Sequence, residues 1–254
     1  KNKLRSNGSR GANPAQEDQA SFNSLRSVEL VDADPLDAIF GIDRYEDISG
    51  ADRIPIEVEV FNGDLKWSKY PVMVGHFKHD GIVSAESAID RYLDNKLSER
   101  HLMGFYPGDI GDQEIIYDPQ NSPIGTVIIG LGDKEDLTGY SLARSVEKAM
   151  LKYAVFFRDN KMDMAHNEEV ATSISTLLVG SNYGKLPMKE SIRSILLGIQ
   201  DANEIIDQFD SLRRITKVEF VDYYEDNAYE CYKVLQELRA EKNTVDISLK
   251  GDIT

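Results

Sequence analysis

Two glycine loops contain the residues whose types and spacing could do chemistry. Gly130-Leu-Gly132 follows a β-branched apolar run, and Gly180-Ser-Asn-Tyr-Gly184 follows a second apolar run. Glycines at a strand-to-helix turn can present backbone N–H groups and a helix N-terminus to an anion. The alternative is that the glycines only permit a tight turn. The candidate ligand-binding residues are therefore Gly130, Gly132, Gly180, Ser181 and Gly184.

The sequence around these loops argues against two familiar chemistries. The glycine spacing fits neither the Rossmann nor the P-loop pattern, and Asp133, Glu135 and Asp136 would oppose a phosphate. Ser181 stands one position too early for the Gly-x-Ser-x-Gly nucleophile motif. We therefore predict no catalytic residue, and a self-contained hydrolase that uses Ser181 or Cys231 is the least favoured function.

Other polar side chains have simple structural interpretations. His76 and His79 could share a metal ion, but no third ligand can be named, so we predict no metal site. Cys231 follows the apolar face of a predicted helix, which indicates a packed core thiol. A cluster of four acidic residues near the end of the chain could bind a cation or a basic partner. The alternative is that these residues form a solvated face. The members of this cluster are Glu219, Asp222, Glu225 and Asp226.

Composition limits the partners of the chain. The 254 residues carry a formal charge of −15, which would repel nucleic acid and an anionic membrane surface. One cysteine excludes an internal disulfide, and no apolar run approaches the ~20 residues of a membrane span. We predict a cytoplasmic protein without nucleic acid or membrane partners.

Strands and helices alternate around the two loops. Thr126–Ile129 predicts a buried strand, and an amphipathic helix follows from the N-cap Thr138. The second loop likewise connects a strand to a helix entered at Pro187. The pair Asn62-Gly63 predicts an antiparallel hairpin at the start of the fold. This order predicts an α/β fold of three layers, with a mixed, mostly parallel sheet and helices on both faces.

Composition also divides the chain into segments. Residues 1–27 are polar and predict a flexible tail, and residues 28–52 predict a short peripheral segment. The α/β domain is predicted over residues 53–242. Residues 243–254 are predicted to be a linker or the start of a further element.

From about Ile56 to Leu238 the chain resembles the macro-like accessory region that precedes CHAT (caspase-like) peptidase domains in bacterial proteins. The order and spacing of several short segments define this resemblance more than any one of them. They are Asn62-Gly63-Asp64-Leu65, Tyr70-Pro71-Val72-Met73-Val74-Gly75-His76, Ser84-Ala85-Glu86, Gly104-Phe105-Tyr106-Pro107-Gly108, the Gly130 loop, Leu177-Leu178-Val179-Gly180-Ser181-Asn182-Tyr183-Gly184 and Tyr224-Glu225-Asp226-Asn227-Ala228. A shorter stretch, Pro123 to Met150, is similar to the N-terminal domain of leucyl aminopeptidases.

The resemblance implies a macro-like domain and a function in recognition. The catalytic segments of both families are absent from this sequence. The leading prediction is thus a non-catalytic regulatory module that binds a protein partner or a peptidase-type effector in a bacterial stress or defence system. The alternative is a small-ligand module, in which the Gly130 and Gly180 loops hold a nucleotide-like, ADP-ribose-like molecule. No cofactor is predicted.

Overall fold

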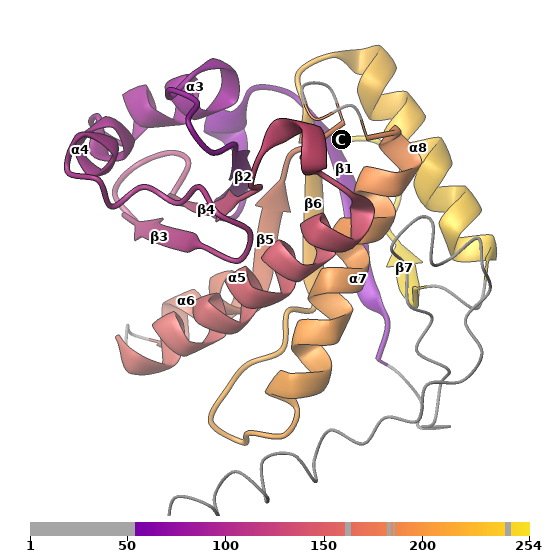
Figure 1. Ribbon diagram of the computed structural model, residues 1–254. Helices are drawn as coiled ribbons and strands as arrows, with labels where there is room; N and C mark the ends of the chain where they lie inside the picture. The colour runs from indigo at the N-terminus through magenta and orange to yellow at the C-terminus, as the bar shows by residue number, and fades with distance from the viewer. Residues whose placement is uncertain (1–53, 161–163, 182–183, 185, 242–244) are drawn as a thin grey trace, which may run out of the picture.

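One mixed sheet forms the middle layer of the protein (Figure 1). The computed structural model describes residues 54–160, 164–181, 184, 186–241 and 245–254, and within them the sheet has seven strands. The predicted tail 1–27 and peripheral segment 28–52 lie outside the described residues. Across the sheet the strands are β3 (Gln113–Tyr117), β4 (Gly125–Gly130), β2 (Val72–His76), β5 (Ser173–Thr176), β6 (Lys217–Asp222), β1 (Ile56–Asn62) and β7 (Ile247–Leu249). Only the β3–β4 pair among them is antiparallel.

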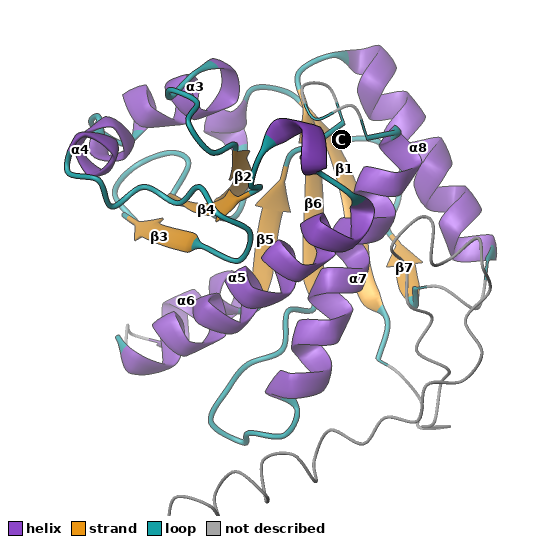
Figure 2. Ribbon diagram, in the orientation of Figure 1, coloured by secondary structure: helices purple, strands orange, loops and turns teal. Residues whose placement is uncertain are grey.

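Helices cover both faces of the sheet, as Figure 2 shows, so the predicted three-layer, mixed α/β fold is confirmed. The larger core lies under three helices, α5 (Gly139–Asp159), α7 (Met188–Ile206) and α8 (Glu225–Ala240). The smaller core on the other face lies under α3 (Ser84–Tyr92) and α4 (Lys96–Leu102). The remaining described elements are α6 (Met164–Ala171) and the short helices η1 (Leu65–Trp67) and η2 (Lys134–Asp136).

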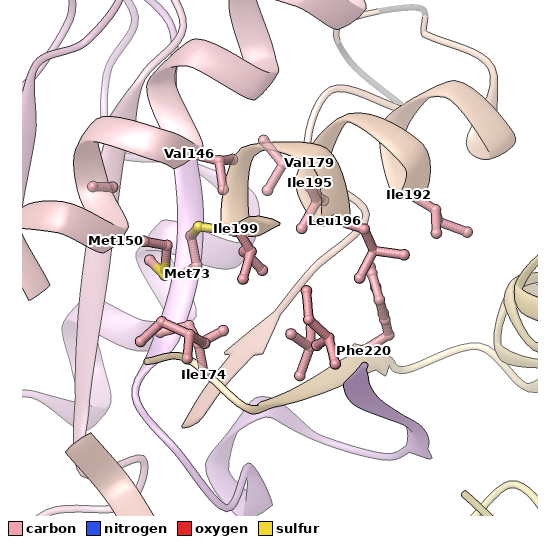
Figure 3. Packing of buried hydrophobic residues seen from close by; sticks show 14 of the residues in the cluster. Met73, Val146, Met150, Ile174, Val179, Ile192, Ile195, Leu196, Ile199 and Phe220 are labelled. Atoms are coloured by element: carbon pink, nitrogen blue, oxygen red, sulfur yellow. The ribbon is translucent and has the colours of Figure 1, made fainter. Parts of the chain in front are cut away.

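Strand alternation assigns each side chain to one of these cores. Val127 and Ile129 of β4 belong to the larger core, whereas Ile128 between them belongs to the smaller one. Both faces of β4 are therefore buried, which explains its unbroken apolar sequence. Figure 3 shows the larger core, where Ile195, Leu196 and Ile199 of α7 lie among side chains of the strands and α5.

Local signals place the two long helices where the sequence predicts them. The Oγ1 of Thr138 accepts a hydrogen bond from the N–H of Ser141, and the Oγ of Ser141 accepts one from the N–H of Thr138. This reciprocal capping fixes the start of α5. Pro187 is the N-cap of α7, next to its predicted first-turn position.

Two features at the sheet edges differ from the prediction. The first strand forms no hairpin, because β1 pairs in parallel with β6 on one side and β7 on the other. The antiparallel edge strand is β3, which follows an irregular loop. Within the segment 243–254, predicted as a linker or the start of a further element, residues 247–249 form a strand that joins this sheet, since their backbone pairs with Ile56–Val58.

Candidate functional site

The two glycine loops meet at one edge of the sheet. Strands β4 and β5 flank β2, and because all three are parallel, their carboxyl ends lie at the same edge (Figure 1). A Cβ on Gly75 of β2 would lie 2.6 Å from side-chain atoms of both Leu131 and Val179, so the loops close over this glycine. Ligands of open α/β sheets bind at such an edge.

Leu137 is the main contact between the loops. A Cβ on Gly180 would lie 2.9 Å from Cδ2 of Leu137, and one on Gly184 would lie 2.5 Å from the same atom. Gly180 also has a φ of 80°, which disfavours any residue with a Cβ. Glycine is therefore required at both positions by the packing of the loops.

The backbone N–H groups of the first loop are all used within the protein. The N–H of Gly130 donates to the carbonyl of Asp112, and the carbonyl of Gly130 accepts from the Oγ of Ser145. The N–H of Gly132 donates to Gly108, and its carbonyl accepts from the N–H of Lys78. The N–H groups of Gly130 and Gly132 thus bind the loop 104–112 to the end of β4. A ligand-binding role for these two glycines remains a prediction.

The second loop has donors that no group in the described part of the chain uses. Among the described residues, the N–H groups of Gly180 and Gly184 have no hydrogen-bond partner. The loop leads into α7, whose N-cap Pro187 makes no side-chain cap bond. The first N–H groups of a helix have no partner within it, and they carry a partial positive charge. Gly180, Gly184 and the start of α7 are therefore the described backbone donors of this edge, and their role in binding a ligand stays a prediction.

Among the described residues, the charged side chains at the start of α7 are engaged elsewhere. Lys189 in the first turn of α7 pairs with Glu237 of α8 at 3.2 Å and with Glu241, the C-cap residue of α8, at 2.8 Å. The carboxylate of Glu190 lies against Gly139 at the start of α5, where it meets another helix N-terminus. Of the described groups around the Gly180 loop, the backbone donors are therefore the ones available to an anion.

Ser181 is half-buried, and its hydroxyl donates to the carbonyl of Leu178 at 2.7 Å. The described residues place no histidine in hydrogen-bond contact with it. His76 and His79 do not converge either, since His76 is buried against Glu86 whereas His79 is exposed. No group of three metal-binding side chains occurs among the described residues.

The predicted acidic cluster is divided by the fold. Glu219 is buried within the sheet, and the carboxylate of Asp222 accepts from the N–H of Tyr224. Glu225 and Asp226 lie in the first turn of α8, where they stabilise the helix dipole, and they line a groove of about 480 Å³ with Asn62 and Tyr229. These acids therefore form no common cation site. The core position of Cys231 is confirmed, because the thiol is buried.

Glu219 is a buried carboxyl group with incomplete hydrogen bonding. Its Oε2 accepts from the hydroxyl of Ser175 at 2.6 Å and from the N–H of Lys69 at 3.1 Å, while Oε1 has no hydrogen-bond partner. The Nζ of Lys69 lies 3.6 Å from Oε1. Burial nevertheless dominates and raises the pKa of Glu219 above its ordinary value.

The raised pKa of Glu219 predicts a pH-dependent effect of Glu219→Gln. The unfolded carboxyl loses its proton near a pKa of about 4.3, whereas the folded one keeps its proton to higher pH. In that pH range the native state binds more protons, so its free energy of unfolding falls as pH rises. We expect the stability of the wild type relative to Glu219→Gln, measured in urea titrations, to fall as the pH rises above about 4. The exposed Glu225→Gln is the control, and an equal trend in both variants would contradict the prediction.

Comparison with known proteins identifies the fold. No family model matches this chain, and no curated protein matches it. Among solved structures, a point mutant of the Oceanobacillus iheyensis macrodomain matches with 16% identity and a TM-score of 0.50, over 72% of this chain and 89% of that one. The Trypanosoma brucei macrodomain in complex with ADP-ribose matches with 15% identity and a TM-score of 0.49, over 90% and 92%.

The first of these matches has the same α/β arrangement, so the chain has the macrodomain fold. At this level of identity the similarity concerns the fold alone. The predicted macro-like domain is confirmed in this sense, whereas an association with CHAT peptidases stays a prediction. Within the described residues, no helix is long and apolar enough to cross a membrane.

Proposed function

We propose that this chain is a binding module for a nucleotide-like ligand with a phosphate or diphosphate group. The observation that supports it is the Gly180 loop, which has N–H groups without a partner among the described residues and leads into the N-terminus of α7, where no side chain caps the helix. The loop lies at the carboxyl edge of parallel strands. Helix N-termini of this kind bind phosphates through backbone donors. The recognised group is therefore the phosphate, with Gly180, Ser181 and Gly184 around it.

ADP-ribose is the first probe, since macrodomains from two organisms have been solved with it. Titration calorimetry should detect binding of ADP-ribose and ADP by the wild type, whereas adenosine, which has no phosphate, should bind at least about tenfold more weakly. A tenfold change corresponds to about 1.4 kcal/mol. If neither ADP-ribose nor ADP binds to the wild type at millimolar concentration, the proposal is contradicted.

Ser181→Asp tests the position of the phosphate. A carboxylate in this loop would repel an anionic ligand, so we expect its affinity to fall at least about tenfold. Ser211→Asp is the matched control, because Ser211 is exposed in the connection from α7 to β6, at the opposite edge of the sheet. Equal loss in both variants would indicate an effect of net charge and not of the loop.

A second candidate function is recognition of a protein partner, such as the peptidase-type effector implied by the resemblance. The end of α4 and the following turn expose three large apolar side chains, Leu102 (86%), Met103 (63%) and Phe105 (71%). Adjacent exposed apolar residues are typical of interaction sites. Light scattering with a co-expressed effector, beside the variant Phe105→Asp, would test this candidate.

A further inference from the structure

His76 and Glu86 form a buried pair at the end of β2. The Nδ1 of His76 lies 3.0 Å from Oε1 and 3.2 Å from Oε2 of Glu86, which stands in the first turn of α3. His76 is 4% exposed and Glu86 is 7% exposed. A carboxylate accepts hydrogen bonds, so the histidine must donate, and its neutral ring then carries the proton on Nδ1.

Neighbouring rings hold this histidine in place. The Tyr106 ring lies 4.7 Å from the His76 ring, edge to face, and the His101 ring lies 5.9 Å away. The Tyr106 hydroxyl donates to Oε1 of Glu86 at 2.8 Å, and burial raises the pKa of this hydroxyl, which keeps it a donor. The orientation of the His76 ring is thus fixed from α3, from α4 and from the loop that contains Tyr106.

The other ring nitrogen of His76 is available. Its Nε2 makes no hydrogen bond within the described part of the chain. In the described part of the chain, the side-chain nitrogen and oxygen atoms that are fully buried without a hydrogen-bond partner belong to Ser173, Arg193, Gln200 and Glu219. Nε2 of His76 is not among them. Nε2 therefore keeps a small contact with solvent, in a side chain that is 4% exposed, and its lone pair is free of hydrogen bonds to the described residues, while Nδ1 is held by a buried carboxylate. General bases have this arrangement.

We propose that His76 and Glu86 form a proton-transfer dyad, in which Nε2 of His76 accepts a proton from water and Glu86 holds the ring tautomer. The probe reaction is hydrolysis of a small activated ester, which needs only a base that takes a proton from water. A water O–H bond breaks as its proton moves to Nε2, and the water oxygen bonds to the acyl carbon. The alkoxide or phenolate leaves with the electrons of the broken C–O bond, and Nε2 returns the proton to solvent.

The dyad is independent of the proposed phosphate site, although it lies close to it. The carbonyl of His76 accepts from the N–H of Leu131 in the Gly130 loop, and Gly75 lies beneath both loops. The His76 side chain, however, lies against α3 and α4, whereas the Gly180 loop leads into α7 on the other face. Failure of nucleotide binding would therefore not contradict the dyad. Failure of ester hydrolysis would likewise not contradict the proposed phosphate site.

Hydrolysis of p-nitrophenyl acetate tests the role of His76. His76→Asn keeps a side-chain donor for Glu86 but removes Nε2, and we expect the rate to fall at least about tenfold, because general-base catalysis contributes ~100-fold or more. His79→Asn is the matched control at an exposed histidine, and its φ of 67° suits asparagine. Its rate should stay within about twofold of the wild type. Equal rates in the wild type and His76→Asn would overturn the proposal.

The positioning role of Glu86 needs a measurement that folding alone would not change. Nitrogen-15 NMR should show His76 of the wild type protonated on Nδ1 and unprotonated on Nε2 when the ring is neutral. In Glu86→Gln the side-chain amide can donate to Nδ1, so we expect the proton to move to Nε2 and ester hydrolysis to slow. Glu86→Asp should restore both. A wild-type ring that carries its proton on Nε2 would refute the dyad even if His76→Asn does not fold.

Discussion

Replacing Gly198 by alanine is expected to lower the free energy of unfolding by about 2 kcal/mol or more, in the upper part of the range for overpacked sites. Gly198 lies in α7 where this helix crosses α5. An added Cβ would overlap the carbonyl oxygen of Ala143 and approach the Cβ of Val146 to 2.8 Å and the N of Glu147 to 3.1 Å. Backbone atoms cannot rotate away, so the two helices must separate.

The same substitution replaces a glycine in the interior of a helix by alanine. That replacement by itself stabilises a helix by ~1 kcal/mol. Chemical denaturation therefore measures which effect is larger, and a more stable Gly198→Ala protein would show that the helices are further apart than described. Gly81→Ala is the control, because a Cβ there meets no atom within 4 Å. Its stability should stay within about 0.5 kcal/mol of the wild type.

Local patterns were sufficient to predict the long helices α5 and α7 and the buried strand β4. Thr138 forms a capping box, and the apolar stripe of the following helix, from Leu142 to Phe157, is buried. These features depend on neighbours within a few residues, which the sequence displays directly. The three-layer arrangement follows because strands and helices alternate.

Strand partners could not be predicted in the same way. The alternation of Ile56, Val58 and Val60 identifies a buried face but not a neighbour, and Asn62-Gly63 suggested a hairpin. In the fold, the Asn62 amide donates to the carbonyl of Asp222, and β1 pairs with β6, which lies about 160 residues further along the chain. Pairing over such a separation depends on how all the layers pack, and short-range periodicity contains no record of it.

The candidate site was predicted in part for a similar reason. The glycine pattern identifies both turns, but tertiary contacts decide which N–H groups stay free. Asp112 and Gly108 occupy the donors of Gly130 and Gly132, and neither contact could be read from the loop itself. The pair of His76 and Glu86, ten residues apart, has no regular spacing that would have revealed it.

Replacing Ile128 by alanine should lower the free energy of unfolding by about 2–5 kcal/mol, the range for a fully buried isoleucine. Ile128 is fully buried on the face of β4 that lies under α3 and α4, and its register partner on β2 is Val74. This smaller core has few other members, so the space left by the side chain has few neighbours that can fill it. Denaturant titration of the purified chain gives the difference directly.

A graded series separates burial from any general effect of changing an isoleucine. Ile128→Val removes one methyl group and should cost only about 0.5–1.5 kcal/mol. Ile54→Ala makes the larger truncation at a residue that is 59% exposed, where we expect a change within about 0.5 kcal/mol. If Ile128→Ala costs no more than Ile54→Ala, β4 cannot be covered by α3 and α4. The second helical layer of the fold, which also holds Glu86, would then be misplaced.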